Sequence, residues 1–442
     1  MRRTNRWFLI SATVAAGGLA LSGCSGGGGG PSESSGPQTV VIYGPDTGTE
    51  ATELEASWAD WADQNNITIE YDGDKDFTTN IATKIQANAL PDIGMFPQPG
   101  LLNAAIQTGT VVKLDDAAKS NVQQNFSEDW QGYVTSDGDL YATPMDASVK
   151  GYVWYRPADF QKWGVEVPTT YQELLDLTAK IQQATGNPPW CAGFNAGTTS
   201  GWPGADQLAE VVLGFSGPDV YDGWVKGDTK FTDQPIDDAF TQLGKILQDP
   251  KYVNAGFGDI ASINSTAFGD VAAKVADGEC ALTNQATFLE ASFATTKTES
   301  GATPTVGEDG DIWAFPLPAE QSGQNAVTGG GDFAAAFNDN DATMKVMEYL
   351  SSADWANSLI SVENASFISA NKGLDASKEK DPLLQDAIRI LQDEKTVFRF
   401  GADDAMPNVV ETAFWAGIVA WINGTPQEEV EQQMQAAWAS AG

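Results

Sequence analysis

Tryptophan, carboxylate and glycine residues form the combinations in this sequence that are best suited to chemistry. Asp206 follows Trp202 within a Gly-Trp-Pro-Gly-Ala-Asp stretch, and Asp332 follows three consecutive glycines. Further along, Asp403 precedes a Phe-Trp pair that ends at Trp415. An aromatic face covers the apolar side of a sugar ring, and fixed polar groups pair with its hydroxyls. These residue types therefore predict a binding site for a polyhydroxylated ligand.

Catalysis is the less favoured class. The sequence contains no histidine, which removes Ser-His-Asp and Cys-His nucleophile systems and every histidine metal site. A glycosidase needs two carboxylates that face each other, and the adjacent pairs Asp403-Asp404 and Asp237-Asp238 do not show this. The acidic stretch 72–76 lacks the glycine offset and closing glutamate of a calcium loop. We therefore predict no catalytic residue, no metal and no cofactor.

Composition limits the partners. The 442 residues are 42% hydrophobic, which is enough for two or more lobes with buried cores. The chain has 24 basic and 60 acidic residues and a net charge of −36, which argues against nucleic acid or anionic lipid as a partner. The acidic residues are spread along the chain, so a solvated surface explains most of them.

The N-terminus has the pattern of a bacterial lipoprotein signal. Three arginines lie among the first six residues, an uncharged apolar run covers 7–21, and Leu-Ser-Gly precedes Cys24. This resembles the lipobox, after which the cysteine becomes the lipidated first residue. We therefore expect a signal peptide over 1–23 and a flexible lipidated tether over 24–38. The alternative is a plain secretory signal with a chance cysteine.

The globular part opens with alternating strand and helix signals. They predict a parallel sheet, whose binding loops lie at the carboxyl ends of its strands. Asp46, Gly48 and Glu50 come after the first strand, and Asp76 comes after the second. These predicted elements are a strand over 40–43, a helix over 50–63, a strand over 67–71, a helix over 77–89 and a strand over 91–96.

Later segments extend this pattern. Thr169 and Thr170 with Glu173 form a capping-box pattern at the start of a helix predicted over 171–185. Residues 139–144 and 149–156 are expected to form paired extended segments, and 311–318 to form a strand that returns to the first lobe. The end of the chain, from about Ser358, is expected to be helical and to pack on the second lobe.

Several motifs in order resemble the extracellular solute-binding proteins of sugar ABC transporters, the maltose-binding-protein-like family 1. They are Leu-Pro-Asp-Ile at 90–93, Pro-Gln-Pro-Gly at 97–100 and Gly-Thr-Val-Val-Lys-Leu-Asp at 109–115. The resemblance implies a type II periplasmic-binding-protein-like α/β fold, with two lobes of mostly parallel sheet flanked by helices and joined by a hinge. We place the first lobe at 39–148 and 311–357 and the second at 149–310 and 358–442.

A set of motifs is most similar to the α-glucoside-binding branch of this family: Pro-Gln-Pro-Gly at 97–100, Trp-Cys at 190–191, Gly-Trp-Pro-x-x-Asp at 201–206, Gly-Gly-Gly-Asp at 329–332 and Asp-x-Met-Pro at 404–407. The chain departs from that branch at Ala205, where relatives tend to have Thr, and at Asp404, where they tend to have Ser. The predicted ligand-binding residues, from the loops above and from the resemblance, are Asp46, Gly48, Glu50, Asp76, Gln98, Trp202, Asp206, Gln285, Phe288, Gly331, Asp332, Arg399, Asp403 and Trp415.

Two cysteines remain once Cys24 is assigned to lipidation. Cys191 and Cys280 form an even pair in an oxidising compartment, and the resemblance implies that relatives carry both. We expect a disulfide inside the second lobe; two buried free thiols are the alternative.

The resemblance thus implies a monomeric substrate-binding lipoprotein on the outer face of a Gram-positive-type cell membrane. It would hold an α-glucoside, a disaccharide or short oligosaccharide, in the cleft between the lobes and deliver it to ABC permease subunits. One alternative is the same fold with a polyol, a glucosylated osmolyte or a β-linked oligosaccharide as ligand. A second is a secreted glycan-degrading enzyme, which turnover of an oligosaccharide would distinguish.

Overall fold

The computed structural model divides the chain into two units, Met1–Pro37 and Gln38–Gly442. It describes residues 37–321, 323, 326–362 and 366–441. The predicted signal peptide and Cys24 lie outside the described residues. Within those residues, no helix combines the length and the apolar character needed to cross a membrane.

The first sheet has the strand order β2-β1-β3-β14-β6. Strand β1 runs parallel to β2 and β3, and β14 runs antiparallel to β3 and β6. One strand, β14, therefore opposes the direction of the other four. The strands are β1 (Gln38–Gly44), β2 (Ile67–Gly73), β3 (Ile93–Phe96), β6 (Ala142–Pro144) and β14 (Phe333–Ala336).

Amphipathic helices cover this sheet, and three of them, α4 (Asp116–Asn125), α5 (Glu128–Tyr133) and α12 (Asp341–Leu350), begin at side-chain caps. Asp115 accepts a hydrogen bond from the amide of Ala118, and Ser127 accepts one from the amide of Trp130. This part of the fold also contains the helices α1 (Thr49–Gln64), α2 (Phe77–Gln86) and α3 (Pro99–Gln107). A small hairpin joins β4 (Thr135–Ser136) to β5 (Asp139–Leu140).

The second sheet repeats the same plan in the order β10-β9-β11-β8-β12. Here β8 runs antiparallel to β11 and β12, while β9 pairs in parallel with β10 and β11. The opposed strand is again the one that enters the sheet after the chain has crossed between lobes. The strands are β8 (Tyr152–Tyr155), β9 (Trp190–Cys191), β10 (Val253–Asn254), β11 (Leu282–Gln285) and β12 (Trp313–Pro316).

Strand β12 differs from the expectation that it returns to the first lobe. Trp313 pairs with Tyr155 and Pro316 pairs with Tyr152, both on β8 of the second sheet. The return is made instead by β13 (Ala326–Gly330) and then β14. An apolar strand signal does not reveal which sheet the strand joins, because either sheet buries it equally well.

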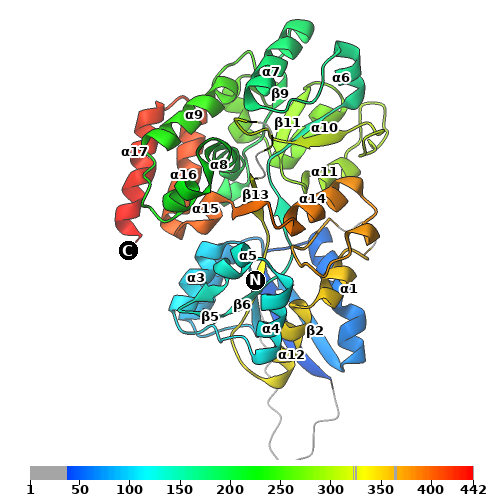
Figure 1. Cartoon of the computed structure of the whole chain (residues 1–442), viewed down its shortest axis with the longest axis vertical. Helices are drawn as coiled ribbons and strands as arrows, with labels where there is room; N and C mark the ends of the chain where they lie inside the picture. Colours follow the sequence, from blue (N-terminus) through cyan, green and yellow to red (C-terminus); the bar gives the residue numbers. More distant parts are fainter. Residues whose placement is uncertain (1–36, 322, 324–325, 363–365, 442) are drawn as a thin grey trace, which may run out of the picture. The chain divides into compact units, whose positions relative to one another are not determined.

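Helices of the second lobe include the predicted capping-box helix, and Figure 1 shows α8, α9, α16 and α17 gathered together. Helix α7 spans Tyr171–Thr185 as predicted: the Thr170 hydroxyl accepts from the amide of Glu173, whose carboxylate accepts from the amide of Thr169 at 2.7 Å. The other helices are α6 (Pro157–Trp163), α8 (Trp202–Val225), α9 (Gln234–Leu247), α10 (Val271–Ala276), α11 (Leu289–Thr295), α15 (Ala402–Ala405), α16 (Asn408–Ile422) and α17 (Gln427–Ala437).

A three-stranded sheet of order β15-β13-β7 carries the chain crossings between the two larger sheets. Its strands are β7 (Ser148–Val149), β13 and β15 (Val397–Phe400). Strand β13 pairs antiparallel with β7 and parallel with β15. Strand β7 leads into β8 of the second sheet, and β13 leads into β14 of the first sheet. The three-stranded sheet therefore links the two lobes.

The segment after residue 357 packs differently from the expectation. Trp355 and Ser358 of α13 (Ala353–Leu359) both hydrogen-bond to Ser57 on α1. Helix α14 (Pro382–Gln392) buries its apolar face in the hydrophobic core that contains the first sheet. From Ala402 onward, the buried apolar residues belong to the hydrophobic core of the second lobe. The exact lobe boundaries stay a prediction.

The disulfide between Cys191 and Cys280 is confirmed. Their Cα atoms lie 5.6 Å apart across a sequence separation of 89 residues. Both side chains are buried and pack against Val271. The bond ties β9 to the segment before β11, so it closes a long loop within one lobe.

Replacing both cysteines by alanine should lower the free energy of unfolding by about 2–4 kcal/mol, because the unfolded chain regains the freedom of the open loop. Urea unfolding followed by far-UV circular dichroism measures the difference. A double variant with unchanged stability would contradict a stabilising role for the bond.

Candidate functional site

Four acidic residues gather at the end of the first sheet, and we call them the first carboxylate cluster: Asp46, Glu50, Asp146 and Asp332. The backbone amide of Asp332 donates to Asp146 Oδ1 at 3.3 Å. Tyr71 holds the loop after β1, since its hydroxyl accepts from the amide of Asp46 at 3.0 Å. Asp146 and Asp332 are 4% and 5% exposed. Residues of three separate segments therefore bring carboxyl groups to one place.

Burial controls the protonation of this cluster. Desolvation raises the pKa of Asp146 to about 7, although hydrogen bonds from Asp332 oppose the shift. Desolvation also raises the pKa of Asp332, and the charges of Asp146 and Asp46 raise it further. The pKa of Asp46 is raised by burial and by the charges of Asp146 and Glu50. A ligand that donates hydrogen bonds would relieve this mutual repulsion.

Gly331 makes the cluster possible. Its φ is +146°, and a Cβ built on it would lie 2.3 Å from the carbonyl oxygen of Asp146. No other residue type fits such a close approach of two backbone segments. The predicted role of this glycine as a ligand contact stays a prediction.

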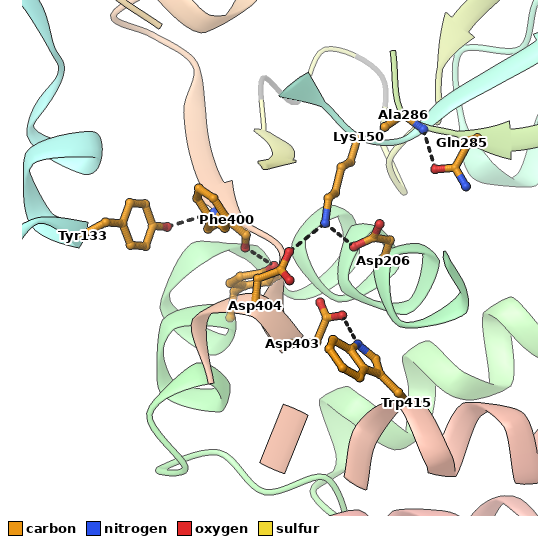
Figure 2. A network of polar contacts seen from close by, with 10 residues as sticks. Tyr133, Lys150, Asp206, Gln285, Ala286, Phe400, Asp403, Asp404 and Trp415 are labelled. Atoms are coloured by element: carbon orange, nitrogen blue, oxygen red, sulfur yellow. Dashed lines mark hydrogen bonds and ion pairs between the residues drawn. The ribbon is translucent and has the colours of Figure 1, made fainter. Parts of the chain in front are cut away.

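A second group, which we call the lysine cluster, consists of Lys150, Asp206, Asp403, Asp404 and Glu411. Lys150 Nζ lies 2.6 Å from Asp206 Oδ1 and 2.9 Å from Asp404 Oδ2 (Figure 2). Lys150 is 9% exposed, and Asp206 is 4% exposed. The ammonium group comes from the segment after β7, and its two partners come from α8 and α15.

Asp403 and Trp415 complete this cluster. The indole Nε1 of Trp415 donates to Asp403 Oδ2 at 2.6 Å, and both side chains are buried (Figure 2). Burial and the charge of Asp404 raise the pKa of Asp403 to about 7, while Lys150 lowers it. Burial also raises the pKa of Glu411, and Asp404 and Asp403 add to that shift.

Lys150 itself stays charged. Burial lowers its pKa, but the charges of Asp206, Asp404 and Asp403 raise it more, so the pKa lies well above its usual value. Oxygens of these three aspartates converge closely enough to hold a metal ion. The ammonium already stands between Asp206 and Asp404, and a metal ion there would meet a like charge.

Three aromatic rings stand beside the lysine cluster. The Trp202 ring meets Phe268 at 5.0 Å and Phe288 at 5.9 Å between centroids, both edge to face. Lys150 Nζ lies 6.0 Å from the centroid of the Trp202 ring. Trp202 begins α8, so this helix presents an aromatic platform at its first residue and a carboxylate one turn later.

The two clusters are neighbours across the end of β13. A Cβ built on Gly330 would lie 3.3 Å from Lys150 Cε, and the next residue, Gly331, approaches Asp146. Asp146 and Lys150 also stand on one short segment around β7. The site therefore combines acidic groups of both lobes around the chain crossings.

The structure brings together nine of the predicted residues: Asp46, Glu50, Gly331, Asp332, Trp202, Phe288, Asp206, Asp403 and Trp415. Other predicted residues have other surroundings. Gln98, the buried N-cap of α3, accepts from Thr78, and Gln285 accepts from the amide of Ala286. Gly48 and Asp76 are exposed residues at the starts of α1 and α2.

Arg399 connects the two lobes rather than standing free. Its guanidinium binds Asp222 of α8 through Nε at 2.5 Å and Nη2 at 2.9 Å, and Nη1 reaches Asp129 of α5 at 3.1 Å. Nearby, the hydroxyl of Tyr133 accepts from the amide of Phe400 (Figure 2). A ligand contact from Arg399 stays a prediction.

Sequence reasoning missed Lys150, Asp146, Glu210 and Glu411. Asp146 and Ser148 lie between the two segments expected to be extended, and Lys150 lies in the second. An extended stretch through 145–148 as well would have placed the three side chains on one face, because their spacing is two. Glu210 lies one turn of α8 after Asp206, where burial raises its pKa to about 8 and Asn284 donates to its Oε2 at 3.1 Å. No local pattern marked Glu411.

A cavity of about 350 Å³ adjoins the lysine cluster on the side of α14. It is bounded by residues that include Lys150, Glu210, Thr328, Tyr171 and Arg389. Lys150 is the one member of the two clusters on its wall. We place the candidate site at the clusters, because the aromatic platform and the unpaired carboxylate oxygens are there.

The pH dependence of stability follows from the raised pKa values. Asp146 and Asp403 have a pKa of about 7 in the folded chain, against about 4 in the unfolded chain. The folded state therefore binds more protons between about pH 4 and 7, so stability should fall as pH rises through this window, by up to about 1.4 kcal/mol per group per pH unit. Urea unfolding at pH 5 and pH 8 measures this.

Asp403→Asn serves as the matched variant for this measurement. It keeps the shape of the side chain and removes one titrating group, so its stability should change less with pH than that of the wild type. A wild-type stability that increases from pH 5 to pH 8 would refute the assignment of protonated buried carboxyls.

The chain is similar to known proteins over most of its length. A family model described as bacterial extracellular solute-binding protein matches residues 46–357. The osmoprotective compounds-binding protein GgtB of Synechocystis is 29% identical over 95% of this chain and 96% of its own length. The α-glucosides-binding periplasmic protein AglE of Rhizobium meliloti is 30% identical over 91% of this chain and 87% of its own length.

Solved structures show the same fold. A chitin oligosaccharide binding protein superposes with a TM-score of 0.74 at 19% identity, covering 92% of this chain and 99% of that one. Maltose-bound MalE3 of T. maritima superposes with a TM-score of 0.66 at 17% identity, covering 91% and 99%. The predicted type II fold is confirmed, and the chain belongs to the family of bacterial extracellular solute-binding proteins.

Proposed function

We propose that this protein is the substrate-binding lipoprotein of an ABC sugar importer and that it captures an α-glucoside, a disaccharide or short oligosaccharide, between its lobes. One observation carries the proposal: the Trp202 ring stands beside buried carboxylates that have unpaired oxygens. Asp206 Oδ2 and Asp403 Oδ1 lack a hydrogen-bond partner among the described residues, and so does Asp146 Oδ2. Buried polar atoms of this kind are usually paired, so a ligand that supplies donors is expected there.

A sugar supplies what these groups lack. Its hydroxyls donate to carboxylate oxygens, and the apolar face of a pyranose ring packs on an indole. Family membership and the names of the relatives GgtB and AglE support a glycoside as ligand. The α-glucoside assignment rests on the motif resemblance and on the name of AglE.

Delivery would use the chain crossings. Strands β7 and β13 connect the lobes, and the residues that would bind the ligand lie on both sides of these strands. A ligand held by both lobes stabilises the closed arrangement, which permease subunits would recognise. Arg399 would change its distance to Asp129 during this motion, because its other partner, Asp222, belongs to the second lobe.

A glucosylated osmolyte is the second candidate within the same class, because GgtB carries the name of an osmoprotectant-binding protein. A polyol or a β-linked oligosaccharide would use the same groups. A glycan-degrading enzyme would instead release products. Recovery of the unchanged sugar after incubation separates binding from turnover.

Trp202→Ala should weaken sugar binding at least about 10-fold, because the sugar ring loses the indole face against which it packs. The affinity is measured by calorimetric titration of the chain from Ser25 onward. The sugars are trehalose, maltose, sucrose, isomaltose, maltotriose, xylobiose and glucosylglycerol. Trp163→Ala is the control, since Trp163 is a half-buried tryptophan at the end of α6, away from both clusters.

The result also decides the site. Wild-type affinity in a folded Trp202→Ala protein would place the ligand elsewhere. Binding of xylobiose alone would retain the class and reject an α-glucoside.

The lipid anchor at Cys24 is proposed from the sequence. Cys24→Ala in the full-length chain should move the protein from the membrane fraction to the soluble fraction of a bacterial host, because the lipid-bearing thiol is gone. Ser25→Ala is the control and should remain membrane-bound. Equal membrane association of both variants would argue for a different mode of attachment.

A further inference from the structure

The charge balance of the site indicates which ligands it accepts. In the lysine cluster, one ammonium group faces four carboxyl groups. Its Nζ already donates to Asp206 at 2.6 Å and to Asp404 at 2.9 Å. Asp403 and Glu411 are buried nearby, at 1% exposure each. The positive charge of Lys150 is therefore used inside the protein.

The first carboxylate cluster adds acceptors, and the described charges that act on it most strongly are acidic. The charges that act most strongly on Asp332 are those of Asp146, Asp46 and Glu50, all of them carboxyl groups. Asp146 Oδ2 is buried and has no partner among the described residues. The first lobe therefore offers hydrogen-bond acceptors.

The two clusters are neighbours along the chain. Asp146 and Lys150 lie on one segment, and Gly330 and Gly331 approach Lys150 and Asp146 respectively. Trp202 places its ring 6.0 Å from Lys150 Nζ. A disaccharide packed against Trp202 would meet acidic groups in both directions.

We propose that the site selects uncharged, hydroxyl-rich glycosides and rejects glycosides that carry a carboxylate or phosphate. This inference rests on the proposed function and restricts its ligands to glycosides without a charge. Asp404 is the residue that we assign to selection by charge, since it shares with Asp206 the pairing of the ammonium group of Lys150, which could otherwise bind an anion.

The physical reason is like-charge repulsion in a desolvated site. At pH 7.5, above the pKa of about 7 of Asp146 and Asp403, these two buried carboxyls are mostly ionised. A ligand anion beside them would be repelled at low effective dielectric, where the repulsion is several times stronger than in water. A neutral hydroxyl instead donates to the same oxygens. Replacing a hydroxyl of the sugar by a carboxylate therefore turns an attractive contact with these oxygens into a repulsive one.

The test uses two matched pairs of ligands on the wild-type protein: glucosylglycerol with glucosylglycerate, and trehalose with trehalose 6-phosphate. Calorimetric titration at pH 7.5 and low salt should show that the neutral member of a bound pair binds at least about 100-fold more tightly. Equal or tighter binding of the anionic member would overturn the proposal and leave the proposed function intact. If no sugar of either charge binds, the proposed function and the proposed charge selection are both refuted.

A variant tests the assigned residue. Asp404→Asn releases Lys150 from one partner, so the preference for the neutral member should fall at least about 10-fold. Asp238→Asn removes an exposed carboxylate on α9 and should leave the preference unchanged. Circular dichroism establishes that each variant is folded, and an unchanged preference in folded Asp404→Asn would refute the role of Asp404.

Discussion

The pairing of Lys150 with Asp206 and Asp404 is the interaction on which the rest of the site depends. Burying one ammonium and several carboxylates is costly unless the charges meet, and removing one partner of such a group typically costs about 3–5 kcal/mol. The partners lie 56 and 254 residues from Lys150 in sequence. One short segment after β7 therefore connects α8 and α15 electrostatically, and it does so beside the chain crossings.

The fold supplies this arrangement through its glycines and its opposed strands. In each sheet the strand that follows a crossing, β8 or β14, runs against the other four, so the crossings converge at one place. Gly330 and Gly331 let β13 approach the segment that carries Asp146 and Lys150. A side chain at Gly331 would collide with the carbonyl oxygen of Asp146 and force the two segments apart. The acidic lining and the aromatic platform of Trp202 then follow from helices that begin at this edge.

Much of the fold could be predicted from sequence, because strand and helix signals in the first lobe are local. In the second lobe, the capping box at Thr170 and the helix that follows it are also local. The disulfide joins cysteines 89 residues apart and was expected from their even number and from the resemblance. The sheet of β12 was not predictable, because its partner β8 lies far away in sequence and either core suits an apolar strand. Trp202, Asp206 and Asp403 could be named from motifs. The spacing of two that Lys150 shares with Asp146 and Ser148 indicates a common face but not that the lysine is buried, because its burial depends on two distant aspartates.

The most direct test is a crystal structure of the protein with a bound neutral glycoside from the titration panel. We expect the sugar ring to pack on Trp202, with its hydroxyls within hydrogen-bond distance of Asp146 or Asp332 on one side and of Asp206 or Asp403 on the other. Lys150 should keep its contacts with Asp206 and Asp404. A sugar bound instead in the cavity beside Tyr171, Glu210 and Arg389, with the two clusters untouched, would contradict this assignment of the site.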